Sequence, residues 1–175
     1  WDNPNQIAGN GTIGLEILDS LPNVTDIIIS IGGGGLIAGI TVAVKALKPA
    51  VRIWGVETEG AQTMGKALEA GKVVQITPNS LAKTLSATYV AEDALTIAQQ
   101  HLEQYIVVSD QEAIESQKFL LERTKVLTEL AASCTFSAAQ KIHQHFSKND
   151  HVVMLLCGGN ESLANMFGYN KVNQS

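Results

Sequence analysis

The sequence predicts an α/β fold in which a mostly parallel, twisted sheet lies between helices on both of its faces. Short apolar segments rich in β-branched residues alternate along the chain with longer amphipathic segments. Such alternation is typical of right-handed βαβ units, which build three-layer parallel sheets. Residues 24–30, VTDIIIS, are nearly continuously apolar, as expected for a strand that is buried on both faces. In sheets of this kind, ligands bind beyond the carboxyl ends of the strands.

The first half of the chain is expected to contain three helices and two strands. Thr12 is a suitable N-cap for a helix at residues 12–20, with Glu16 near its positive end. The strand 24–30 and a run of glycines lead to the helix LIAGITVAVKAL, which ends before Pro49 because the residue before a proline disfavours helical backbone. A second strand is expected at residues 51–57, followed by a helix at residues 60–71 that stops at Gly71.

The second half of the chain continues the alternation after a loop at residues 72–90. Ser109 and Asp110 form a good N-terminal cap. A helix rich in small residues, such as the one expected after residue 130, suits close packing on a sheet. The expected helices lie at residues 91–104, 110–123, 130–146 and 161–168, and the expected strands at residues 106–108 and 151–157.

Composition indicates one globular domain over residues 1–175. The chain is 45% hydrophobic and 17% charged, which is ordinary for a folded protein. Its net charge of -5 and the lack of a basic stripe argue against a nucleic-acid partner. No apolar run approaches the ~20 residues that a membrane-spanning helix needs. Cys134 and Cys157 show no metal-ligand or redox spacing, which fits a reduced, cytoplasmic setting.

Four consecutive glycines, at residues 32–35, separate the strand 24–30 from the helix that begins at Leu36. Without Cβ atoms, such a backbone can take positive φ and approach a ligand closely. Its N–H groups lie at the start of a helix, where the helix dipole adds partial positive charge. The loop therefore predicts an anion site, above all for a phosphate group. A second glycine turn, Gly158-Gly159, follows the last expected strand and is expected at the same crevice.

Other interpretations of the glycine loop stay open at this point. The spacing differs from the GxGxxG dinucleotide motif, although Glu57 stands at the end of the next strand, where that motif requires an acidic residue. No Gly-Lys-Ser/Thr follows, which excludes a Walker loop. A tightly packed turn without a ligand is the simplest alternative. Consecutive glycines are destabilising by roughly 0.5–1 kcal/mol each relative to alanine where φ is negative, so a ligand is favoured.

Three segments resemble the fold-type-II pyridoxal-phosphate enzymes, and specifically their serine/threonine dehydratase (ammonia-lyase) and serine racemase group. These segments are IAGNGTIGLEIL, SIGGGGLIAGI and LLCGGN, in that order along the chain. Two further segments, GVETEGA and SLAKTL, favour the serine dehydratase branch. The resemblance implies a tryptophan synthase β-like fold, of which this chain is the C-terminal part of the large domain. It also implies pyridoxal phosphate as the cofactor and an amino acid, serine or threonine, as the substrate.

The resemblance assigns the cofactor contacts to residues of this chain. The cradle for the cofactor phosphate is Gly32, Gly33, Gly34 and Gly35, together with Leu36. Cys157 matches the position where a serine or cysteine faces the pyridine nitrogen. A neutral thiol there does not force the nitrogen to stay protonated, as an aspartate would. A plain buried cysteine is the alternative for Cys157.

The resemblance also implies a cation site. Its ligands are the carboxylate of Glu57 with backbone carbonyls near Gly32, Ala61, Leu85 and Ala87. Hard oxygen ligands suit potassium or magnesium. Thr63 stands where the divalent-binding racemases place an acidic residue, which favours a monovalent ion. A charge at the N-terminus of a helix is an equally good interpretation of Glu57, and a helix-starting carboxylate is an equally good one of Glu129.

The catalytic lysine of the resembled group, which forms the Schiff base with the cofactor, lies in an N-terminal motif that this chain lacks. Lys83 matches a different position. We therefore expect this chain alone to be inactive in the dehydratase reaction, which eliminates water, releases ammonia and leaves a 2-oxo acid. A serine racemase-type fragment and a non-catalytic module that binds a phosphorylated small molecule are the alternatives. The resemblance also leaves room for a homo-oligomer, since many such enzymes associate.

Overall fold

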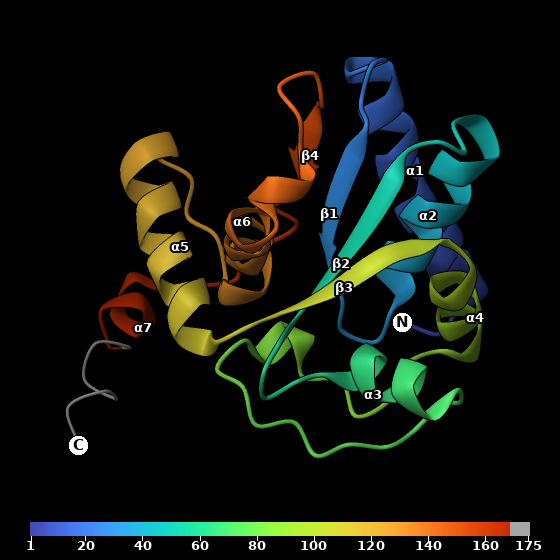
Figure 1. Cartoon of the computed structure of the whole chain (residues 1–175). Coiled ribbons are helices and arrows are strands. Elements are labelled where there is room, and N and C mark those ends of the chain that lie inside the picture. The colour runs from blue at the N-terminus through green and yellow to red at the C-terminus, as the bar shows by residue number, and fades with distance from the viewer. Residues whose placement is uncertain (169–175) are drawn as a thin grey trace.

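The computed structural model describes residues 1–168 and shows one parallel sheet between two layers of helices (Figure 1). The strands are β1 (Asp26–Ser30), β2 (Arg52–Thr58), β3 (Leu102–Val108) and β4 (Val152–Met154). Their order across the sheet is β3-β2-β1-β4, and every neighbouring pair is parallel. The helices are α1 (Pro4–Ser20), α2 (Gly35–Leu47), α3 (Thr63–Ala70), α4 (Glu92–His101), α5 (Asp110–Thr124), α6 (Leu130–Lys141) and α7 (Leu163–Gly168). The predicted α/β fold class is therefore confirmed.

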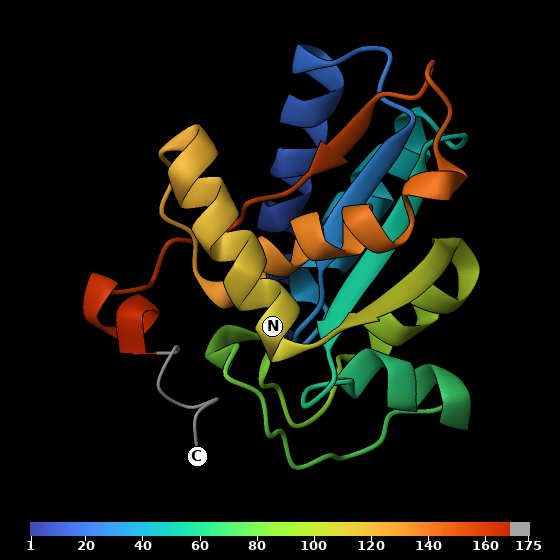
Figure 2. The same ribbon diagram turned by 60° about the vertical axis from the view of Figure 1, so that its left-hand side comes forward.

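Each face of the sheet has its own apolar core, which explains the continuous apolar run of β1. Side chains of a strand alternate between the two faces. Ile27 and Ile29 pack in the core under α1, α2 and α4, whereas Ile28 packs with Trp54 in the core under α5 and α6. Figure 2 shows α5 and α6 on one side of the sheet and α1 and α2 on the other. The three isoleucines are completely buried.

The first helix begins at Pro4, so the prediction of a start at Thr12 was wrong. Asn3 is the N-cap, and its side chain accepts a hydrogen bond from the N–H of Asn5 at 2.9 Å. Proline at the first helical position reinforces this start. Thr12 lies within α1 and donates to the carbonyl of Gly9 at 2.8 Å. The glycine content of the segment reflects close packing of α1 against α2, since a Cβ on Gly11 would lie 3.1 Å from the Gly39 carbonyl oxygen.

Other helix and strand boundaries differ from the predicted ones, because pairing between distant strands overrides the local sequence pattern. β3 begins at Leu102 rather than residue 106, because it pairs with β2 along its whole length apart from a register shift. α6 ends at Lys141, and residues 143–145 form a short 3₁₀ turn. β4 contains three residues rather than the seven expected, and among the strands of residues 1–168 it pairs with β1 alone. No described helix is both long and apolar enough to cross a membrane.

Two helix ends follow the sequence signals. Ser109 and Glu112 form a complete capping box at the start of α5, with each side chain bonded to the backbone of the other residue. Gly71 ends α3 in the left-handed conformation. In Figure 1 the loop between α3 and α4 runs below the sheet, at the carboxyl ends of the strands. This loop therefore borders the crevice where the sequence places a ligand.

Candidate functional site

A cavity of about 290 Å³ lies at the carboxyl end of β1. It brings together the glycine loop, the loop that contains the 3₁₀ turn Lys83–Leu85, the start of α6 and the segment after β4. The residues that line it are Trp1, Gln6, Asn10, Ser30, Gly32, Gly33, Gly34, Gly35, Leu36, Thr84, Leu85, Glu129, Ala131 and Cys157. All six residues predicted to contact the cofactor are in this set.

The glycine loop forms an uncapped helix start that faces this cavity. Gly34 is the N-cap of α2 and has φ 91°, and as a glycine it offers no side chain to cap the helix. The first N–H groups of a helix have no acceptor within it. A Cβ on Gly34 would lie 2.5 Å from the Cβ of Ala94, so packing and dihedral angle both require glycine. The loop is held by a hydrogen bond of 3.0 Å from the N–H of Ala91 to the carbonyl of Gly33.

The indole of Trp1 lies directly against the backbone of Gly33. A Cβ on Gly33 would overlap this ring, and a Cβ on Gly35 would lie 2.6 Å from the Trp1 carbonyl oxygen. The indole of Trp1 also contacts the ring of Tyr89, with 5.4 Å between the two ring centroids. The loop thus admits a group in direct contact with its backbone, as a phosphate-bearing cofactor requires. No pattern in the sequence predicted Trp1 at this place.

Cys157 faces the cavity beside Ser30. The segment after β4 stays next to β1, since the N–H of Leu155 donates to the carbonyl of Ile28 at 3.1 Å. The Cys157 sulfur lies 3.3 Å from the Ser30 hydroxyl oxygen. Burial by neighbouring groups raises the pKa of the thiol, although one side of the residue is exposed. Cys157 is therefore not a plain buried cysteine, whereas Cys134 is completely buried.

Glu129 connects three walls of the cavity. Its carboxylate accepts from the Thr84 hydroxyl at 3.0 Å, and its N–H donates to the carbonyl of Gly158 at 3.1 Å. A Cβ on Gly158 would lie 2.5 Å from the same carboxylate. Glu129 is the N-cap of α6 without a capping side-chain bond, so it both starts the helix and borders the site. Thr84 is a lining residue that the sequence analysis missed.

The loop at residues 80–85 is held by a buried polar network. The Thr58 hydroxyl donates to Ser80 at 2.8 Å, and the Ser80 hydroxyl donates to Asp110 at 2.6 Å. The second carboxylate oxygen of Asp110 accepts from the N–H of Leu81 at 2.8 Å. Lys83 donates to the carbonyl of Ser80 at 3.1 Å. This network fixes the wall that carries Thr84 and Leu85.

The residues of the expected cation site lie near the start of α3. Glu57 is completely buried, and its two oxygens accept from the N–H groups of Met64 and Gly65, each at 2.8 Å. These bonds match the helix-terminus interpretation of Glu57. The Ala87 carbonyl accepts from the Thr63 hydroxyl at 2.8 Å. Burial raises the pKa of Glu57 to about 7, against the effect of its backbone hydrogen bonds.

Ala61 and Leu85, the other two residues expected at the cation site, are both buried nearby. The N–H of Ala61 donates to the carbonyl of Thr58 at 2.8 Å. The Cα of Leu85 would lie 3.4 Å from a Cβ on Gly32. The structure thus places Leu85 beside the glycine loop, where it also lines the cavity.

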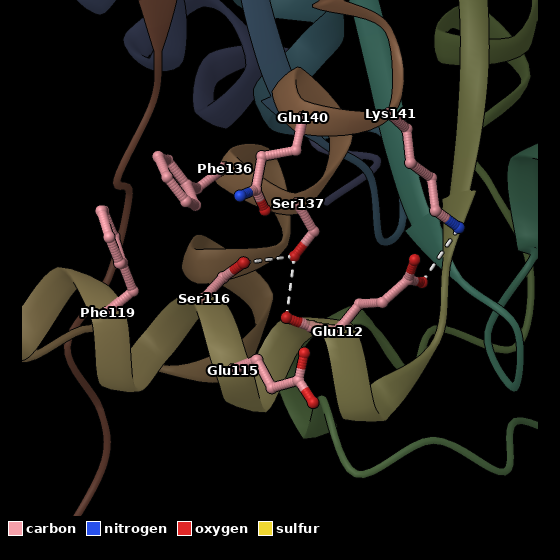
Figure 3. Close-up of a pocket in the computed structure, with 8 residues that line it drawn as sticks. All are labelled: Glu112, Glu115, Ser116, Phe119, Phe136, Ser137, Gln140 and Lys141. Atoms are coloured by element: carbon pink, nitrogen blue, oxygen red, sulfur yellow. Dashed lines mark hydrogen bonds and ion pairs between the residues drawn. The ribbon is translucent and has the colours of Figure 1, made fainter.

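A larger cavity, about 360 Å³, lies between α5 and α6 on the outside of the molecule (Figure 3). Four of its polar side chains are engaged in two pairs. The hydroxyls of Ser116 and Ser137 are 2.6 Å apart, and Lys141 pairs with Glu112 at 2.9 Å. Its apolar end is a stack of Phe119 on another phenylalanine, with centroids 4.9 Å apart. This cavity contains none of the residues predicted to bind a ligand.

The fold and the first cavity define a class: an open parallel α/β domain with a glycine-rich helix start beside a cavity at the carboxyl end of a strand. The family described as "Pyridoxal-phosphate dependent enzyme" matches residues 1–158. The chain belongs to this family. The glycine cradle, which side chains would fill, and the neutral thiol that lines the same cavity fit a phosphate-bearing heteroaromatic cofactor.

Individual relatives support this assignment. The chain is 35% identical over 167 residues to the catabolic L-threonine dehydratase TdcB of Escherichia coli (strain K12), an alignment that covers 94% of this chain and 50% of the relative. A fungal L-serine ammonia-lyase from Rhizomucor miehei superimposes with a TM-score of 0.89 at 28% identity, covering 97% of this chain and 57% of that one. A maize serine racemase superimposes with a TM-score of 0.85 at 29% identity, covering 95% and 54%. The chain spans about half the length of the curated relatives it matches.

Proposed function

We propose that this chain forms the cofactor-binding part of a pyridoxal-phosphate-dependent dehydratase that acts on L-serine or L-threonine. The reaction eliminates water from the amino acid and releases ammonia, which leaves a 2-oxo acid. One observation carries the proposal: a single cavity joins the uncapped glycine start of α2 with the thiol of Cys157. In this proposal, residues 1–175 are one domain, the C-terminal part of the large domain of the enzyme.

The residues of the chain have distinct parts in this proposal. The N–H groups of Gly33, Gly34 and Gly35 bind the cofactor phosphate, aided by the positive end of α2. Cys157 contacts the ring nitrogen with a neutral group. Bound pyridoxal phosphate supplies an electron-withdrawing ring that stabilises negative charge on the substrate. The hydrogen bond between Glu129 and Thr84 fixes a further part of the cavity wall.

The chain alone is proposed to bind the cofactor without turning over substrate. Lys83 is engaged with the Ser80 carbonyl and lies in a loop that Asp110 holds, so it is not a substitute for the catalytic lysine. Incubation of the chain with pyridoxal phosphate and L-threonine is expected to yield no 2-oxobutanoate. Release of 2-oxo acid by the chain alone would contradict this part of the proposal.

The cofactor assignment is tested by titrating the chain with pyridoxine 5′-phosphate, which lacks the aldehyde. The indole of Trp1 lies on the glycine loop, whereas the only other tryptophan, Trp54, is buried in the core. Saturable change of tryptophan fluorescence is expected, and Trp1→Phe is expected to remove most of it. Competition by inorganic phosphate is also expected. Binding that is unaffected by removing the phosphate from the ligand would refute the assignment of the glycine loop.

A cation near the start of α3 is part of the same proposal. Potassium or magnesium would approach the Ala87 carbonyl and the Glu57 carboxylate, which are linked through Thr63 and the first turn of α3. Thermal unfolding in potassium, sodium and magnesium chlorides at equal ionic strength tests it. Equal melting temperatures in the three salts would remove the cation from the proposal.

A racemase is the second candidate, because solved serine racemases from maize and from Dictyostelium discoideum both superimpose with a TM-score of 0.85. The two activities differ in their product. Assay of the protein together with its lysine-bearing part distinguishes them, since a dehydratase yields pyruvate from L-serine and a racemase yields D-serine. A chain that binds phosphate ligands but supports neither reaction would be a non-catalytic module.

A further inference from the structure

Ser30, the last residue of β1, lies beneath the thiol of Cys157. The hydroxyl oxygen and the sulfur are 3.3 Å apart. Ser30 is 4% exposed, whereas Cys157 is exposed to the cavity that both residues line. The serine is therefore the more buried member of the pair, and the sulfur is the more open to the cavity.

The direction of this hydrogen bond follows from the strengths of the two groups. A hydroxyl is a strong donor, whereas a thiol is both a weak donor and a weak acceptor. The sulfur is the partner that the described part of the chain gives the Ser30 side chain. A buried hydroxyl without an acceptor costs more free energy than a thiol hydrogen that faces an open cavity. The favoured arrangement has Ser30 donating to Cys157.

We propose that Ser30 is a positioning residue: its hydroxyl donates a hydrogen bond to the Cys157 sulfur, which turns the thiol hydrogen toward the ring-binding part of the cavity. The pair then presents one neutral donor, which suits an uncharged aromatic nitrogen. This inference rests on the proposed function, because it requires that a nitrogen heterocycle bind here.

The surroundings of Cys157 keep that hydrogen in place. Burial raises the pKa of the thiol, the Ser30 hydrogen bond lowers it, and the nearby carboxylate of Glu129 raises it, with a net upward direction. The thiol is therefore protonated near neutral pH. A carboxylate at the same place would select the protonated ring nitrogen instead.

The first test compares two ligands that differ at one ring atom: pyridoxine 5′-phosphate and its 1-deaza analogue, in which C–H replaces the nitrogen. The chain is expected to bind the nitrogen ligand more tightly, and Ser30→Ala is expected to reduce that preference by about fivefold, the factor of a typical hydrogen bond. Affinity for the deaza analogue is expected to stay unchanged. Ser30→Thr, which keeps a hydroxyl, is expected to retain the preference.

The outcomes separate this inference from the proposed function. Equal losses for both ligands in Ser30→Ala would show a packing role and overturn the inference, while the cofactor site would stand. An unchanged preference would overturn it as well. If neither ligand binds, the proposed function fails and the ring-directed role fails with it.

A second measurement needs no ligand. Alkylation of Cys157 by iodoacetamide at fixed pH reports its thiolate fraction, and the Cys157→Ala variant gives the background from Cys134, the other cysteine of the chain. Ser30→Ala is expected to slow alkylation by about threefold or more, because it removes the hydroxyl that stabilises the thiolate. Ser30→Thr is expected to retain the original rate. An unchanged rate in Ser30→Ala would show that Ser30 does not act on the sulfur and would overturn the inference.

Discussion

Replacement of Gly34 by alanine tests the central feature of the site, the left-handed start of α2. Gly34 has φ 91°, and an L-residue in this region costs roughly 1–2 kcal/mol. The added Cβ would also lie 2.5 Å from the Cβ of Ala94 in α4, so the glycine loop or α4 must shift. Such overpacking costs typically about 1–3 kcal/mol. The sum predicts that Gly34→Ala lowers the free energy of unfolding by about 2–5 kcal/mol.

Gly71→Ala is the matched control for this prediction. Gly71 has φ 67°, but a Cβ there would meet no atom within 4 Å. Its replacement therefore carries the dihedral cost alone, roughly 1–2 kcal/mol. Urea unfolding followed by circular dichroism measures both variants, and a titration with pyridoxine 5′-phosphate follows.

Gly34→Ala is expected to weaken phosphate-ligand binding and Gly71→Ala to leave it unchanged. If the two variants lose equal stability, the contact with Ala94 does not constrain the loop. If Gly34→Ala binds the ligand normally, the geometry of the helix start is not what holds the phosphate.

Four further changes test other features. Gly9→Ala, at an exposed position within α1 where a Cβ meets no atom within 4 Å, is expected to stabilise the chain by roughly 0.5–1 kcal/mol in urea unfolding, and a loss would contradict the helix start at Pro4. Asp26→Ala removes a buried carboxylate that accepts a hydrogen bond from the Trp54 indole at 2.7 Å. The free energy of unfolding is expected to fall by about 2–3 kcal/mol, and a fall of less than about 0.5 kcal/mol would refute the structural role of Asp26. Because burial raises the pKa of Glu57 to about 7, the free energy of unfolding is expected to fall as pH rises from about 4.5 through 7, by up to roughly 3 kcal/mol. In potassium-free buffer, the Glu57→Gln variant is expected to lose this pH dependence. Trp1→Ala uncovers Gly33 and is expected to tighten binding of pyridoxine 5′-phosphate by calorimetry, whereas weaker binding would show that the indole is part of the site.

Much of the fold could be predicted because its signals are local. The apolar run of β1 requires burial on both faces, and residues 27–29 alternate between the two cores as that burial demands. The capping box at Ser109 and the terminal glycine at residue 71 fix helix ends through bonds within a few residues. β3 was predicted too short because its first half is polar, and only pairing with β2 makes it a strand.

The meeting of the glycine loop and Cys157 in one cavity could be predicted, because strand-end positions in a parallel sheet converge on one crevice, and their contact with a cofactor stays a proposal. Ser30 and Thr84 could not be found from the sequence, since each acts through a partner far along the chain, Cys157 and Glu129 respectively. For Glu57 the sequence left a cation ligand and a helix-terminal carboxylate equally open. Its bonds to the first turn of α3 match the second, and the cation stays a proposal.

The short pairing of β4 with β1 has a consequence for how the chain reaches its native state. The two strands join segments more than a hundred residues apart through a register of three residue pairs. Closing so long a loop costs chain entropy before the new contacts compensate for it, so β4 is expected to dock late in folding. Cys157 arrives with it, which means that the ring end of the cavity is assembled last. A ligand that touches both the glycine loop and Cys157 would bind the last part to form to the rest of the domain, and would protect β4 from hydrogen exchange more than any other strand.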